Sequence, residues 1–146
     1  SELDEDVLLA IDRAIPLPII FQLHHEQRTR MVSAYKRPSE ADASKWVIDG
    51  YFAGGWLPAD SPRQALPVAL DLQGLYEQLL RSLLPSPARP GESLPEQLQR
   101  LNRLRSLHSE HAKLGTRLHK EKQFNRKVAL NAQLREIQNE IAELSA

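Results

Sequence analysis

Cysteine is absent from the 146-residue sequence. Its absence excludes disulfides, thiolate metal ligands and cysteine nucleophiles, and it fits a protein of a reducing compartment. Long apolar runs are absent too, because no stretch approaches the roughly 18 consecutive apolar residues that indicate a membrane-spanning helix. The first six residues contain four acids, which is the wrong sign for the start of a signal peptide. We therefore expect a soluble, cytoplasmic protein that does not engage a membrane.

A net charge is also absent, since 19 basic residues balance 19 acidic ones. The balance is not local. Residues 1–70 contain 7 basic and 10 acidic residues, whereas the stretch from Arg100 to Lys127 contains 9 basic residues and only Glu110 and Glu121 as acids. Any attraction to an anionic partner is therefore expected in the C-terminal part of the chain.

The first part of the chain predicts a small α+β body over residues 1–85. Short β-rich runs at 19–23, 29–35 and 46–52 are separated by polar or glycine-containing segments, which predicts one antiparallel sheet. Helical spacing predicts a helix before these strands, and Asp71 can cap another helix after them. Residues 58–67 contain three prolines and are expected to be irregular. The first helix would present Leu3, Val7, Leu8, Ile11 and Ile15.

Most of the aromatic residues fall in or near the predicted strands, where a sheet would pack them. We expect them to form its core together with one methionine: Phe21, Met31, Tyr35, Trp46, Tyr51, Phe52 and Trp56.

The last part predicts an antiparallel helical hairpin over residues 94–146, after a proline-rich linker at 86–93. Ser93 and Glu96 form a capping-box pattern at its start. Two heptad-like stripes follow, and their members mirror one another about Phe124. A bend near residue 124 would stack them as five layers: Leu118 on Leu130, Leu114 on Leu134, His111 on Ile137, Leu107 on Ile141 and Leu104 on Leu144.

The predicted bend is the best candidate for a functional site. Lys120, Lys122, Arg126 and Lys127 surround Phe124 there. A basic arm with an aromatic residue at its end could contact a protein partner, or it could follow a phosphate backbone. The competing interpretation is that these side chains form the solvated face of a hairpin.

Metal binding and catalysis have weaker support. His108 and His111 have i, i+3 spacing, but no acid lies one turn further on, so we expect no metal site and no cofactor. No common catalytic motif occurs, and we assign no catalytic residue. A nuclease-like set of Lys36, Glu40 and Asp49 is conceivable, although such side chains at strand ends are usually only solvated. We expect a protein that is not an enzyme.

Four segments resemble a bacterial family of unknown function: IPLPIIFQL (15–23), AYKRPSEADASKW (34–46), DLQGLYEQLLRSLLP (71–85) and KEKQFNRKVALNAQL (120–134). Members of that family are often encoded beside DNA methyltransferases and helicases of restriction-like defence clusters. They are longer, so the resemblance implies that this chain corresponds to their C-terminal two-thirds. It implies a context of bacterial defence and brings no established catalytic residues.

We therefore expect a non-catalytic interaction module, an accessory subunit of a bacterial DNA-modification or defence complex. Its partner would be a protein, such as a methyltransferase or helicase subunit, and a homodimer is a further alternative. Two other functions stay open. The chain could be a fragment of a nuclease whose N-terminal part is missing, or it could bind nucleic acid directly through the basic hairpin.

Overall fold

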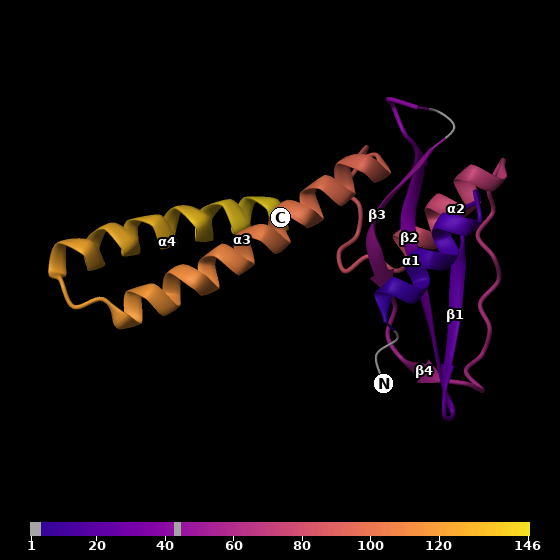
Figure 1. Ribbon diagram of the computed structural model, residues 1–146, viewed down its shortest axis with the longest axis horizontal. Coiled ribbons are helices and arrows are strands. Elements are labelled where there is room, and N and C mark those ends of the chain that lie inside the picture. Colours follow the sequence, from indigo (N-terminus) through magenta and orange to yellow (C-terminus); the bar gives the residue numbers. More distant parts are fainter. Residues whose placement is uncertain (1–3, 43–44) are drawn as a thin grey trace. The chain divides into compact units, whose positions relative to one another are not determined.

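A computed structural model of the chain describes residues 4–42 and 45–146, which form two compact units (Figure 1). The first unit ends at Pro87 and the second begins at Ala88. Leu3, which was predicted to lie on the first helix, falls outside the described residues. The first unit contains α1 (Glu5–Ala14), β1 (Ile20–His25), β2 (Arg28–Pro38), β3 (Trp46–Ala53), β4 (Leu57–Pro58) and α2 (Leu72–Arg81). The second contains α3 (Leu94–Lys120) and α4 (Phe124–Ser145). This is the predicted α+β class.

Strand β2 is the centre of the sheet. It pairs antiparallel with β1 and with β3, so the three predicted strands and their place in one antiparallel sheet are confirmed. The two-residue strand β4 pairs with the start of β2, within a part of the chain where the prolines predicted an irregular path. Pro58 is tolerated there because proline fits a short, peripheral strand that needs few backbone donors.

A bulge between β2 and β3 decides which side chains share a face. Ala34 pairs with Tyr51 while Tyr35 pairs with Asp49, so Gly50 is an extra residue on β3. Gly50 has φ +63, in the left-handed region that favours glycine. Without the bulge, strand alternation would put Asp49 and Tyr51 on the same face. With it, the two side chains lie on opposite faces of the sheet.

The core of the first unit surrounds β2. Five consecutive residues, Val32 to Lys36, are buried, which requires cover on both faces of the strand. The expected aromatic core is only partly correct. Tyr35 and Phe52 are buried, but Met31 is 43% exposed and lies one residue before the buried run. The other expected members are only half-buried: Phe21, Trp46, Tyr51 and Trp56.

The second unit is the predicted antiparallel hairpin, with the turn at residues 121–123. Contacts between the two helices show that they are antiparallel, because residues later in α3 contact residues earlier in α4. Arg103 Nε lies 2.6 Å from Glu140 Oε1, and His111 Nε2 lies 3.1 Å from Gln138 Nε2. The seam is centred on the buried Leu107, Leu114 and Ile137, with four partly buried residues around them: Leu130, Leu134, Ile141 and Leu144.

Two helix starts are capped as predicted. The Asp71 carboxylate accepts a hydrogen bond from the Gly74 N–H at 2.7 Å, and α2 follows. Ser93 and Glu96 form a reciprocal capping box at the start of α3, since each side chain accepts from the other residue's backbone N–H. Both caps could be predicted from the sequence because each cap involves residues only three positions apart.

Candidate interaction surface at the hairpin tip

The five predicted site residues lie together where α3 ends and α4 begins. Lys120 is the last residue of α3, Lys122 lies in the turn and Phe124 is the first residue of α4. Arg126 and Lys127 follow in the first turns of α4, and all five residues are exposed. Phe124 is 77% exposed and the nearby Val128 is 52% exposed. We call residues 120–128 the hairpin tip.

One acid organises the tip. The Glu121 carboxylate accepts hydrogen bonds from the backbone N–H groups of Lys122 at 2.8 Å and Gln123 at 2.9 Å. These backbone donors, with Arg126 and Lys127 nearby, hold the pKa of Glu121 below its usual value. Its other carboxylate oxygen lies 3.9 Å from Arg126 Nη1. The turn is therefore tied down while the cations around it stay exposed.

The start of α4 is not built for helix stability. Gln123 is its N-cap residue, but the side chain makes no cap hydrogen bond, and the first turn contains no acid. Arg126 and Lys127 place positive charge close to the positive end of the helix dipole, where it is unfavourable. The start of α1 shows the favourable arrangement, with Asp4 as a capping side chain and Glu5 in the first turn. The cations of the tip therefore suit an anionic contact better than they suit the hairpin.

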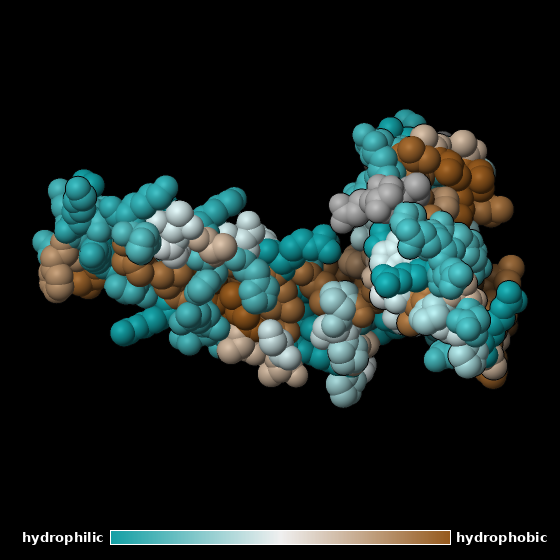
Figure 2. All heavy atoms as spheres, turned by 90° about the horizontal axis from the view of Figure 1, so that it is seen from below, coloured by the Kyte–Doolittle hydropathy of each residue, from teal (hydrophilic) through white to brown (hydrophobic). Residues whose placement is uncertain are grey.

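Two arginines in the first half of α3 form close ion pairs, whereas most other cations of the hairpin form none with the described residues. Arg100 Nε lies 2.7 Å from Glu92 Oε1, and Arg103 is paired with Glu140. Within the described part of the chain, seven further cations of the hairpin make no ion pair: Arg105, Lys113, Arg117, Lys120, Lys122, Lys127 and Arg135. Hydrophilic side chains project along this hairpin in Figure 2.

His108 and His111, the two histidines with i, i+3 spacing, differ in their surroundings. The ring of His111 is half-buried beside the seam and meets the Gln138 amide, whereas His108 is exposed. Among residues 4–42 and 45–146, no three His, Cys, Asp or Glu side chains gather as a metal site would require.

The nuclease-like set does not assemble. Asp49 Oδ2 lies 3.3 Å from Arg37 Nε, and Glu40 lies 3.8 Å from the same guanidinium group. Lys36 is on the opposite face of β2, because neighbouring strand residues alternate and the bulge at Gly50 moves Asp49 to the side of Arg37. The idea that Lys36, Glu40 and Asp49 form one site is therefore wrong for this unit.

Lys36 instead belongs to a buried polar cluster that sequence reasoning missed. Its Nζ donates to the Asp12 carbonyl at 2.5 Å and the Leu17 carbonyl at 3.0 Å, and also to the carbonyl of Ile15. The Asp12 carboxylate lies 3.4 Å from the same Nζ and accepts a hydrogen bond from the Tyr51 hydroxyl at 2.5 Å. Burial, followed by the hydrogen bond to Asp12, raises the pKa of Tyr51.

This cluster joins the end of α1 to β2 and β3. Lys36 is 3% exposed and Asp12 is 2% exposed, so neither is available to a substrate. The only sequence signal was a lysine directly after the apolar run of β2. Because its partner is 24 positions away, no local pattern could identify the pair.

A family model described as a domain of unknown function (DUF4391) matches residues 1–141 of the chain. No curated protein and no solved structure matches it. In the described part of the chain, none of the helices has the length and apolar character needed to cross a membrane.

Proposed function

We propose that this chain, which belongs to the family of the domain of unknown function DUF4391, is a non-catalytic interaction module. Its hairpin tip contacts a protein partner. One observation carries this proposal: exposed cations surround a 77% exposed phenylalanine, Phe124, and two of them, Arg126 and Lys127, oppose the dipole of α4. Exposed aromatic residues and arginines are enriched at protein interfaces, where they supply contact area and charge-assisted hydrogen bonds.

The proposed context is a bacterial DNA-modification or defence complex in the cytoplasm. The chain would be its accessory subunit and would bind a methyltransferase or helicase subunit. The resemblance described above supports this context. Its most specific segment, residues 120–134, contains the whole charged part of the tip.

The surface of the first unit supports a protein as the partner. Val68 is 95% exposed, Leu70 is 106% exposed and Leu72 is 83% exposed, although all are large apolar residues. Hydrophobic side chains also remain visible at the surface of this unit in Figure 2. Groups of exposed apolar side chains are typical of surfaces that bind another protein, and they contribute little to the binding of nucleic acid.

Direct binding of nucleic acid is the second candidate function. The seven cations of the hairpin that make no ion pair with described residues favour it, because each can displace a counterion from a phosphate backbone. Phe124 could stack on an unpaired base. Binding of this kind would weaken steeply as the salt concentration rises, whereas contact with a protein through apolar and polar groups would weaken less.

Charge reversal at the tip tests the proposal. The variant carries Lys122→Glu, Arg126→Glu and Lys127→Glu, and the control reverses three exposed cations of the first unit, Arg28, Lys45 and Arg63. Binding is measured against purified methyltransferase and helicase subunits and against duplex and single-stranded DNA. We expect the tip variant to slow association with the protein partner by about tenfold and the control to have little effect. Sub-micromolar DNA binding that only the tip variant abolishes would replace the protein partner with nucleic acid.

A further inference from the structure

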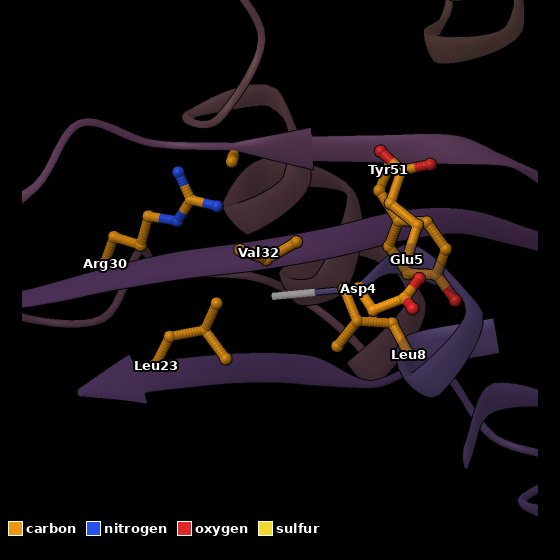
Figure 3. Close-up of a pocket in the computed structure, with 8 residues that line it drawn as sticks. Asp4, Glu5, Leu8, Leu23, Arg30, Val32 and Tyr51 are labelled. Carbon is orange, nitrogen blue, oxygen red and sulfur yellow. The ribbon is translucent and has the colours of Figure 1, made fainter. Parts of the chain in front are cut away.

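The first unit contains a cavity that the proposed function does not use. Its volume is about 550 Å³, within the range of small-molecule sites. Side chains from all three long strands form its apolar floor, and Leu8 of α1 forms a wall. Figure 3 shows Arg30 at one end of this cavity, Glu5 and Tyr51 at the other, and Val32 between them.

Arg30 is held in place without an acceptor. Its guanidinium carbon lies 4.9 Å from the centre of the Trp56 ring, and the centres of the Trp56 and His25 rings are 6.2 Å apart. Arg30 Nε is buried and has no hydrogen-bond partner among the described residues, and the guanidinium makes no ion pair with them. A buried donor without an acceptor loses its hydrogen bonds to water without replacement, so folded proteins keep few of them. The aromatic shelf fixes the side chain, and its unmet donors indicate an anionic ligand.

The opposite end of the cavity has the opposite charge. Asp4 and Glu5 line it, and no described cation lies within ion-pair distance of either carboxylate. Asp4 already accepts the N–H of Asp6 as a helix cap, which leaves Glu5 as the acid whose carboxylate is not used as a cap. Tyr51 closes this end, with its hydroxyl engaged by Asp12.

The two ends lie far enough apart to select an elongated ligand. Tyr51 is paired with Ala34, which is four residues along β2 from Arg30. Four residues of a strand span roughly 13 Å. The floor between the ends is uncharged and apolar, with Val32 and Ala53 as register partners. A ligand that satisfies both ends therefore needs an apolar middle.

We propose that this cavity binds an elongated zwitterion, with a carboxylate on Arg30 and a cationic group beside Glu5. Two leucine residues and a lysine side chain span a similar distance, so a short peptide with a free carboxyl end has this chemistry. The ligand is either such a free peptide or the last residues of another protein chain. Arg30 Nε, the donor without a partner among the described residues, and one terminal nitrogen would hold the carboxylate as a planar fork.

The probe is lysyl-leucyl-leucine, titrated into the full chain while NMR follows the Arg30 Nε–H signal and the backbone amides. We expect saturable shifts at Arg30 and along the cavity. Amidation of the peptide's carboxyl end should weaken binding by about tenfold, because it removes the charged acceptor. A ten-residue peptide with the same last three residues separates the two sources: equal binding indicates a protein terminus, and loss of binding indicates a small free ligand.

Arg30→Met removes the charge, and Arg30→Lys keeps the charge but loses the fork; both should weaken binding, the first by about tenfold or more. Glu5→Gln should weaken it less, because this carboxylate is exposed. Arg28→Met is the matched control, an exposed arginine two residues earlier on β2, and should bind normally. Absence of binding at millimolar peptide would overturn the proposal, as would binding that Arg30→Met leaves unchanged. Because all of these residues lie in the first unit, either result is independent of the hairpin tip.

Discussion

The two units are stabilised in different ways. The first unit keeps a lysine of β2 and an aspartate of α1 almost fully buried, together with the hydroxyl group of Tyr76. The hairpin buries mainly leucine and isoleucine along one seam and leaves most of its charges at the surface. A buried charge loses its hydration and depends on every partner around it, whereas an exposed charge is screened by water. The same kind of substitution should therefore have very different effects in the two units.

The largest effect is expected when the buried pair is broken. Lys36→Met leaves the Asp12 carboxylate buried without its counterion, and it removes the donor to three carbonyls at the end of α1. We expect the free energy of unfolding of the first unit to fall by about 3–5 kcal/mol. Urea unfolding followed by tryptophan fluorescence measures it, because both tryptophans, Trp46 and Trp56, lie in this unit.

Lys45→Met is the matched control for this substitution. The Lys45 side chain is 76% exposed and pairs with Asp42 on the surface. Its replacement should change the free energy of unfolding by less than about 0.5 kcal/mol. If the two variants proved equally stable, the buried cluster would not be what holds α1 to the sheet.

Truncating an apolar side chain of the seam should lower the stability of the hairpin, and the loss should be larger where the side chain is more buried. Leu107 is 1% exposed, whereas Leu134 is only partly buried in the same seam. We expect Leu107→Ala to destabilise the hairpin by about 3 kcal/mol and Leu134→Ala by about 2 kcal/mol. Far-UV circular dichroism during urea unfolding reports this, because α3 and α4 contain most of the helical residues. Val128→Ala, at a half-exposed position of α4, should have almost no effect, and a large loss there would contradict the assigned seam.

Acid should weaken the hairpin unit through the ion pair between Glu92 and Arg100. Hydrogen bonds from Arg100 lower the pKa of Glu92 to about 2 from an ordinary value of 4.5, with a further contribution from the Arg89 N–H. Since the folded-state pKa is the lower one, this stabilisation is complete above about pH 4.5 and is lost as the pH falls toward 2. Glu92→Gln should reduce the change in the free energy of unfolding at the acidic end of this pH range. Unfolding experiments at several pH values measure this change. An unchanged profile would show that Glu92 is not held by Arg100 in solution.

The same contrast explains what the sequence could predict. The capping box at Ser93 and the runs that form the three strands involve residues close together in the sequence, and the structure confirms them, as it confirms the antiparallel hairpin that the leucine stripes predicted. The roles of Lys36 and Arg30 depend on where α1 and Trp56 pack, which no short pattern encodes. The sequence located the basic residues of the tip, because they flank a predicted bend. It gave no sign that α4 begins without a cap, since that depends on which residue takes the N-cap position.

The missing cap of α4 leads to the smallest and most diagnostic prediction. Gln123 has extended backbone angles, φ −83 and ψ 125, but its side chain caps nothing. Gln123→Ser places a hydroxyl where it can accept an N–H of the first turn, so we expect the hairpin to gain about 1 kcal/mol in urea unfolding. Gln123→Ala is the control and should gain little, because it has no acceptor.

The functional consequence of this variant separates stability from contact. Gln123→Ser leaves every cation of the tip and Phe124 in place, so binding to the protein partner should stay unchanged while stability rises. That result would show that the open start of α4 is a tolerated defect beside a binding surface. If binding instead weakened along with the gain in stability, the uncapped N–H groups themselves would take part in the contact. The partner would then reach the first turn of α4 with an anionic group, as helix N-termini favour.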